Sequence, residues 1–447
     1  MALARTGAAL TLILIASTVL NAALFPEVAN VVPLAREVST FSGAIFSVFI
    51  AVAAYTRPSW IRERAISCTL LALLAAGLLV LGIGLTSGNG TLVMLGSPLG
   101  GIGMLWFSVL LGVALTQLPL REAFVVVPAA YVAAYALRFM LTLTGSSLPL
   151  PAAILLYFFA VAGSYLLIAA DVRGIMTAIQ RGESPTVLDA TNPSSFLPFS
   201  SFVYVTILLF NAACGFEMAQ TGGTLPATGE LLACLPVALV LIAAIARPGG
   251  PVKLDTLYLL AALLVVAGLL LIPLRTLPPD VINLSALGPA VLLRGGADTF
   301  SLLTYFLIAA IGSRNPVGAL TTSAFAFSAS WLGIIVGALG QEALTSIGMA
   351  SAEVTLLATA FVTFAFVLYN FVGLRNRSFD GSVAAVVPAF VPFENDSDTP
   401  TAPHVVQTSQ QTTATRAPSE GERPKAQDAL ETGPSATIPS LTADAPP

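Results

Sequence analysis

The sequence predicts an all-α polytopic membrane protein with twelve transmembrane helices in two six-helix halves. Of its 447 residues, 56% are apolar and only 9% are charged, whereas soluble globular proteins carry about 25% charged residues. Twelve stretches are long and apolar enough to cross a bilayer, and basic residues gather in alternate connections between them. This composition excludes most classes of soluble enzyme.

Each predicted span approaches the roughly 20 apolar residues that a helix needs to cross a hydrocarbon core about 30 Å thick. The first six cover residues 7–25, 39–56, 66–86, 92–116, 123–144 and 149–170. The second six cover residues 200–219, 229–246, 255–273, 285–312, 316–340 and 352–374. No clean small-x-small cleavage site follows the first stretch, so we interpret it as a retained helix and not as a secretory signal.

The basic residues indicate the topology, because arginine and lysine concentrate on the cytoplasmic side of membrane proteins. If the N-terminus is cytoplasmic, the only basic residues in external connections are Arg36 and Arg275. The twelve cytoplasmic basic residues are Arg5, Arg57, Arg62, Arg64, Arg121, Arg173, Arg181, Arg247, Lys253, Arg314, Arg375 and Arg377. We therefore expect a multi-pass protein of the cell (inner, cytoplasmic) membrane with both termini in the cytoplasm.

The longest internal connection divides the spans six and six. We expect an N-terminal bundle at 1–170, a cytoplasmic linker loop at 171–199 and a C-terminal bundle at 200–376. This layout resembles the major facilitator superfamily fold, whose halves are related by an axis along the membrane normal. Residues 377–447 are rich in Pro, Ser, Thr, Ala and Gln, which predicts a disordered cytoplasmic tail. Within it, the apolar run 383–393 is too short to span and is expected at the inner leaflet.

The sequence offers little for catalysis or metal binding. The only histidine, His404, lies in the predicted tail, and the three cysteines, Cys68, Cys214 and Cys234, sit in apolar runs without metal-ligand spacing. A Ser-His-Asp triad and a His/Cys metal site are therefore excluded within the membrane. We expect no enzymatic activity, no cofactor and no metal. Because the sequence has no basic block, we also expect no direct nucleic-acid binding.

Ionisable residues inside spans are the candidate ligand-binding residues, because a charge in the membrane usually faces a cavity or a partner. They are Arg138 in the fifth span, Glu217 in the seventh, and Arg294 and Asp298 in the tenth, with Asn211 as a weaker candidate. Helical rise places the four charges at a similar depth in the outer half of the bilayer. Arg294 and Asp298 are four residues apart and can pair on one helical face.

Two interpretations of these charges are open. They can neutralise one another and fix helix packing, or at least one arginine can bind an anionic group, which matches the guanidinium fork. Glycines four residues apart, Gly96 with Gly100 and Gly333 with Gly337, predict close helix packing. The Gly295-Gly296 pair could break the tenth helix beside Arg294, as discontinuous helices do in transporters.

Two stretches carry a further resemblance. Residues 192–220, NPSSFLPFSSFVYVTILLFNAACGFEMAQ, and residues 257–341, which include SRNPVGALTTSAFAFSASWLGIIVGALGQ, resemble the membrane portion of LuxR-type regulators of gut actinobacteria. That resemblance implies a twelve-span, facilitator-like domain, but no helix-turn-helix pattern follows Arg377. The likeness covers mainly the second half of the chain.

The resemblance implies a non-enzymatic, ligand-sensing membrane domain. The alternative is a secondary transporter of a small, anionic organic solute. The loop from Arg57 to Arg64 lacks the glycine and aspartate usual in facilitators, and the first and fourth spans contain no acidic residue, so sensing is favoured over transport. The expected partners are the lipid bilayer, a small anionic ligand and a cytoplasmic signalling protein.

Overall fold

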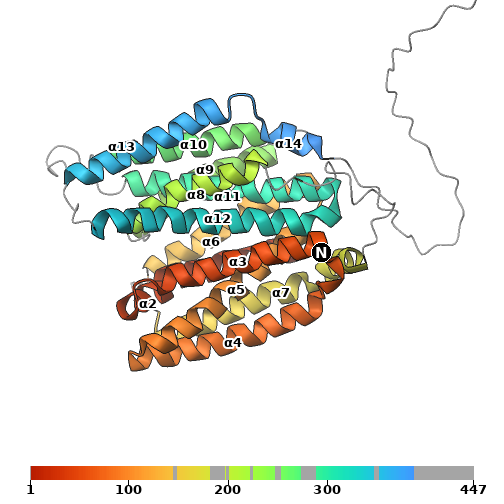
Figure 1. Ribbon diagram of the computed structural model, residues 1–447. Helices are drawn as coiled ribbons and strands as arrows, with labels where there is room; N and C mark the ends of the chain where they lie inside the picture. The colour runs from red at the N-terminus through yellow and green to blue at the C-terminus, as the bar shows by residue number, and fades with distance from the viewer. Residues whose placement is uncertain are drawn as a thin grey trace, which may run out of the picture. The chain divides into compact units, whose positions relative to one another are not determined.

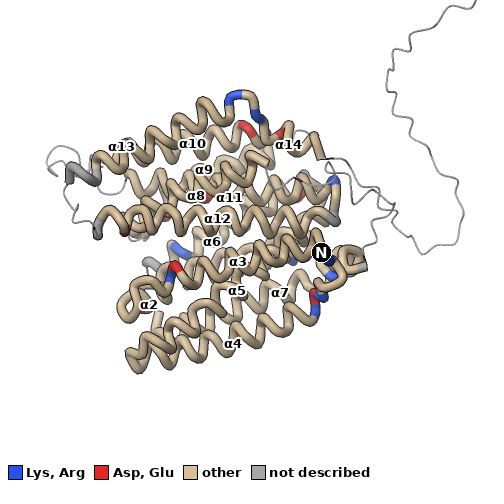
Figure 2. The backbone as a smooth tube through the Cα atoms, in the orientation of Figure 1, with Lys and Arg blue, Asp and Glu red and all other residues tan. Residues whose placement is uncertain are grey.

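The computed structural model describes residues 2–143, 148–181, 197, 201–221, 225–246, 253–272, 288–346 and 352–386. All regular structure in these ranges is helical, and most of the helices run side by side (Figure 1). Charged residues occur mainly toward the helix ends (Figure 2). The described residues therefore have the architecture of a polytopic membrane protein.

The helices that form the first six spans are α1 (Ala2–Val19), continued by a π-turn and α2 (Phe25–Val31), α3 (Ala35–Thr56), α4 (Glu63–Ser87), α5 (Gly90–Leu115), α6 (Leu120–Leu143) and α7 (Leu150–Arg181). Those of the second six are α8 (Phe202–Thr221), α9 (Ala227–Ala246), α10 (Leu254–Leu271), α11 (Gly288–Arg314), α12 (Pro316–Ser346) and α13 (Ala352–Leu368), which a π-turn extends to Gly373. Eleven of these spans are long and apolar enough to cross a membrane, and α8 has a shorter apolar part, Phe202–Phe216. The predicted fold class is confirmed.

Helix α5 lies at the centre of the first half, against α3, α4 and α7. Glycine makes this possible: a Cβ added at Gly101 would lie 1.9 Å from the carbonyl oxygen of Ser39 on α3. Trp106 is 1% exposed, and its ring nitrogen donates to the hydroxyl of Ser67 on α4 at 2.9 Å. Close backbone approach and a satisfied buried indole therefore hold these helices together.

Helix α12 packs on α8 along the predicted glycine seam. A Cβ added at Gly333 would lie 2.3 Å from the carbonyl oxygen of Leu208, and one at Gly337 would lie 2.0 Å from that of Ala212. The predicted break at Gly295-Gly296 was wrong, because α11 continues through both glycines. Both glycines are buried, and they let α11 pack closely against α9 and α10.

The two halves meet where α3 packs on α12 and α6 packs on α9. Two serines exchange hydrogen bonds across the first of these contacts. The Ser47 hydroxyl on α3 donates to the carbonyl oxygen of Ala324 at 2.8 Å, and the Ser328 hydroxyl on α12 donates to that of Ala44 at 3.0 Å. The α3–α12 contact thus includes neutral hydrogen bonds from small residues.

Two predicted boundaries differ from the structure. Helix α7 continues to Arg181, so the linker predicted to begin at 171 starts later; residues 182–196 lie outside the described residues. The tail predicted to be disordered from 377 contains helix α14 (Phe379–Ala385). Residues 387–447 are not among the described residues.

Tertiary contacts explain why α14 forms. Asp255, at the start of α10, accepts hydrogen bonds from the Ser378 hydroxyl at 2.5 Å and from the Phe379 amide at 2.7 Å. Asp380 in turn accepts a hydrogen bond from the amide of Leu254 at 3.2 Å. Each helix start therefore receives a carboxylate from the other, which satisfies amide groups that have no partner within their own helix.

Candidate functional site

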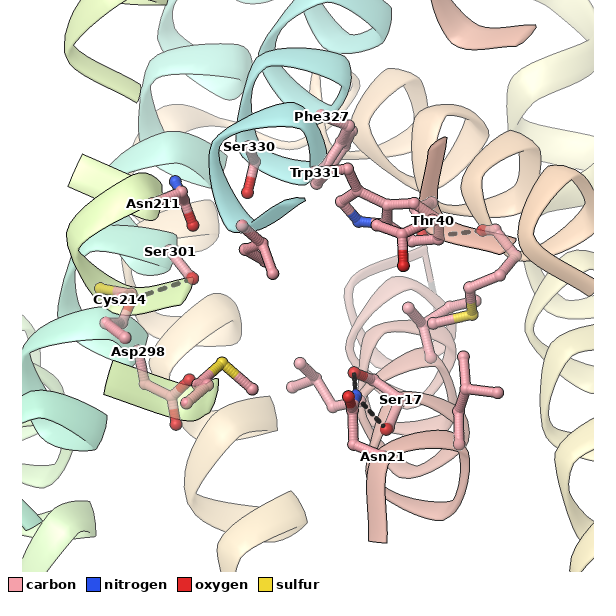
Figure 3. Close-up of a pocket in the computed structure, with 18 of the residues that line it drawn as sticks. Ser17, Asn21, Thr40, Asn211, Cys214, Asp298, Ser301, Phe327, Ser330 and Trp331 are labelled. Carbon is pink, nitrogen blue, oxygen red and sulfur yellow. Dashed lines mark hydrogen bonds between the residues drawn. The ribbon is translucent and has the colours of Figure 1, made fainter. Parts of the chain in front are cut away.

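A cavity of about 210 Å³ lies between the two halves. Its wall comes from α1 and α3 and from the middle of α5 and the second part of α6 in the first half, and from α8, α11 and α12 in the second. Figure 3 shows Ser17 of α1 and Asn21 of the π-turn that follows α1 facing Asp298 of α11 across this space, with Trp331 and Thr40 on another wall. It extends from the middle of the bundle toward the end where α2 joins α3.

Asp298 is the centre of a buried charged cluster beside the cavity. Its Oδ2 accepts a hydrogen bond from the Tyr135 hydroxyl at 2.5 Å. The same oxygen lies 3.7 Å from Nη1 of Arg138 and 3.3 Å from Nε of Arg294. One carboxylate on α11 thereby joins a tyrosine and an arginine of α6 to an arginine of its own helix.

Arg138 is the more deeply buried arginine, with a side chain 6% exposed. Its Nε donates to the Thr18 hydroxyl on α1 at 2.7 Å, and its Nη1 lies 4.0 Å from Oε2 of Glu230 on α9. Its guanidinium also lies 5.1 Å from the ring centre of Tyr135, within the range of a cation–π contact. Arg138 therefore connects four helices, α1, α6, α9 and α11.

Several polar atoms of this cluster lack a hydrogen bond. Nη1 of Arg138, Oε2 of Glu230 and Nε of Arg294 are buried, and each has no hydrogen-bond partner among the described residues. Nη1 of Arg138 and Oε2 of Glu230 are 4.0 Å apart. At this distance the opposite charges attract one another, but no hydrogen bond forms. Buried polar atoms are normally satisfied, so the cluster has hydrogen-bonding capacity that a ligand or water can use.

The charges lining the cavity are predominantly positive. Arg36, Arg138 and Arg294 line it, and Asp298 is the one carboxylate among its described lining residues. Glu230 contacts Arg138 from behind. Arg36 lies in the first turn of α3, with its guanidinium 5.6 Å from the ring centre of Phe25. Such a wall favours a ligand that carries negative charge.

The structure brings together Arg138, Arg294 and Asp298 as the sequence predicts. Asn211 also lines the cavity, but its side-chain amide donates to the carbonyl oxygen of Ile207 one turn earlier at 2.8 Å. Glu217 lies in the described backbone of α8, and its side chain lies outside the described residues.

Sequence reasoning missed Glu230 and Arg36. Glu230 stands near the first residue of a predicted span, where a carboxylate is ordinarily attributed to the membrane surface. Arg36 was counted only as a residue outside the membrane. Their positions are the signal that could have identified both residues. Each lies within one turn of a span whose apolar part is short, so its side chain is close enough to extend into the bundle.

The fold is that of known transporters. The chain is similar to the human organic anion transporter MFSD10 (TETRAN), with a TM-score of 0.53 and 16% identity over 82% of this chain and 98% of that one. It is also similar to the major facilitator superfamily proton:xylose symporter XylE, with a TM-score of 0.52 and 11% identity over 86% of this chain and 97% of that one. No protein-family model and no curated protein sequence matches the chain.

These comparisons correct one prediction. The protein has a major-facilitator-like fold, and both of these solved structures are transporters and not enzymes. The expectation of a non-transporting sensing or signalling domain is therefore wrong, and the transporter alternative is favoured. No match supports the LuxR-type resemblance. At such low identity, the likeness shows the fold and does not identify a substrate.

Proposed function

We propose that the protein is a secondary transporter of a small organic anion. The observation that carries the proposal is the charge of the cavity between the halves, which three arginines and a single carboxylate line among the described residues. Guanidinium groups bind carboxylates through paired, charge-assisted hydrogen bonds. The volume of about 210 Å³ suits a small molecule and not a polymer.

The proposal assigns separate roles to the arginines. Arg138 is held by Thr18, Glu230 and Asp298, so its role is to join helices and position the cluster. Arg294 has a side chain 24% exposed, and Asp298 neutralises it only in part. We assign the contact with the anion to Arg294, and its attraction into the cavity to Arg36 at the start of α3.

The solved structures with a similar fold support a transport function in general. MFSD10 is named an organic anion transporter and XylE a proton:xylose symporter. Transporters of this architecture expose a central site alternately to the two sides as one half rocks against the other. The serine hydrogen bonds between α3 and α12 lie at the contact that such a motion must rearrange. The LuxR-type resemblance does not enter the proposal.

Transport of an anion can be tested in proteoliposomes. The wild-type protein should accumulate radiolabelled benzoate or succinate in preference to the neutral amides of the same acids. Arg294→Gln should lower carboxylate uptake about 10- to 100-fold, which corresponds to the loss of a charge-assisted hydrogen bond. Arg121→Gln, at an exposed position outside the cavity, is the matched control. Equal uptake of acid and amide, unchanged by Arg294→Gln, would overturn the proposal.

The proposal includes an orientation in the cell membrane with both termini in the cytoplasm, because arginines crowd the connections on that side. The cavity then extends from the middle of the membrane toward the outside. Reporter fusions after Arg64 and Arg377 should give cytoplasmic signals, and a fusion at Asn89 should give an external one. The reverse pattern would invert the direction from which the anion enters.

A further inference from the structure

A second hollow lies away from the cavity between the halves, at the adjoining ends of α4 and α7. Its volume is about 580 Å³. We call it the α4–α7 groove; its lining residues are Arg62, Glu63, Arg64, Ala65, Cys68, Arg173, Met176, Thr177 and Gln180. These residues belong to the start of α4 and the last turns of α7. Figure 2 shows charged residues at this end of the two helices.

The three arginines of the groove are available for a ligand. Arg62, Arg64 and Arg173 are exposed, and none of them forms an ion pair with another residue of the described ranges. The carboxylate closest in sequence, Glu63, is only 5% exposed. It accepts hydrogen bonds from the hydroxyl groups of Tyr165 at 2.7 Å and Ser67 at 3.4 Å, so it is engaged inside the bundle.

Two apolar surfaces lead away from the groove along the same helices. On α4, exposed residues recur along one face from Cys68 to Leu79 and Ile83, which are 67% and 58% exposed. On α7, the corresponding face runs from Arg173 back to Leu166 and Phe159, 72% and 63% exposed. The named residues are 4, 7 or 11 positions apart, close to one, two or three helical turns, so each set stays on one side of its helix. The groove is therefore basic at the helix ends and continuous with lipid-facing apolar surface.

We propose that the α4–α7 groove binds the headgroup of an anionic phospholipid. The guanidinium groups would hold the phosphate through charge-assisted hydrogen bonds, and the acyl chains would lie along the exposed faces of α4 and α7. Clustered basic residues at the membrane surface recognise anionic headgroups in this way. A soluble phosphate shares the headgroup chemistry but makes no use of the apolar faces.

Native mass spectrometry of the intact protein in detergent tests the proposal. Dioleoyl phosphatidylglycerol should bind at one saturable site that dioleoyl phosphatidylcholine does not fill. Each arginine should contribute about fivefold to the affinity, so Arg62→Gln, Arg64→Gln and Arg173→Gln combined should weaken binding on the order of 100-fold. Arg121→Gln should leave it unchanged. Equal binding of both lipids, or unchanged binding to the triple variant, would overturn the proposal.

Cys68 provides a second readout, because it lines the groove and is exposed, whereas Cys214 is buried. In phosphatidylcholine vesicles that contain phosphatidylglycerol, its modification by a maleimide should be severalfold slower than in phosphatidylcholine alone, and the triple variant should lose this protection. If inorganic phosphate protects Cys68 equally well in phosphatidylcholine vesicles, the site takes soluble phosphate and the lipid assignment is wrong. A comparison of melting temperatures separates loss of binding from loss of folding.

Discussion

Neutralising Asp298 is the most direct perturbation of the charged cluster. In Asp298→Asn, Tyr135 loses its charged acceptor and Arg138 keeps Glu230, 4.0 Å away, as its remaining ion-pair partner among the described residues. Breaking a buried ion pair costs about 3–5 kcal/mol, because the other charge stays buried. Polar contacts within membranes are often weaker. We therefore expect a loss of about 3 kcal/mol in the free energy of unfolding.

A double-mutant cycle separates mutual pairing from independent roles. The cluster contains two arginines and two carboxylates, so each single change, Asp298→Asn or Arg138→Gln, leaves a net charge of one unit, and the double change restores neutrality. The combined loss should be smaller than the sum of the single losses by about 2 kcal/mol, within the range for residues in contact. Arg138→Gln also removes the bond to Thr18, which the double change does not restore.

The cycle can be measured by SDS titration in mixed micelles, followed by tryptophan fluorescence. Glu122→Gln, the loss of an exposed carboxylate on α6, is the control and should change the unfolding free energy by less than about 0.5 kcal/mol. Strict additivity of the two single losses would refute the reasoning, because it would mean that Asp298 and Arg138 do not stabilise one another.

Three other predictions concern packing and the C-terminal segment. Gly101→Ala should prevent folding or cost several kcal/mol in unfolding free energy, because the added carbon would lie 1.9 Å from a carbonyl oxygen of α3. In Gly100→Ala the added carbon meets nothing within 4 Å, so this variant should be tolerated. Melting temperatures of the two variants provide the comparison. Truncation after Val386 should leave detergent-extracted yield unchanged, but truncation after Arg377 removes α14 and should lower the melting temperature. Trp106→Phe should cost about 1 kcal/mol in unfolding free energy, because a buried serine hydroxyl loses its indole donor.

The spans and the three central charges were predictable because a bilayer imposes strict requirements on sequence. A run of about 20 apolar residues is typical of a transmembrane helix and rare elsewhere, and a charge inside one, such as Arg138, must find a partner. Sequence spacing also predicted the pairing of Arg294 with Asp298. The partnership of Arg138 with Glu230 was not predictable in this way, because it depends on how α6 packs against α9 across the two halves.

The differences in the second half have a similar cause. Gly295 and Gly296 favour a broken helix by local propensity, but close packing on neighbouring helices keeps α11 continuous. Helix α14 has only 7 residues, too few for a periodic signal, and it depends on the carboxylate of Asp255, which is more than 100 positions away in sequence. Tertiary contacts decide both outcomes, and one sequence does not reveal them.

The paired serine hydrogen bonds between α3 and α12 have an energetic consequence for the equilibrium between conformations. Neutral bonds of this kind measured inside membranes contribute about 0.6 kcal/mol each on average, so the pair from Ser47 and Ser328 contributes roughly 1 kcal/mol. A ligand that binds one conformation about tenfold more tightly gains about 1.4 kcal/mol, which exceeds that contribution. A buried ion pair at the same place would cost several times more to separate. Because hydroxyl groups join α3 to α12, modest differences in binding can offset the share that this contact contributes to the energy between the conformations.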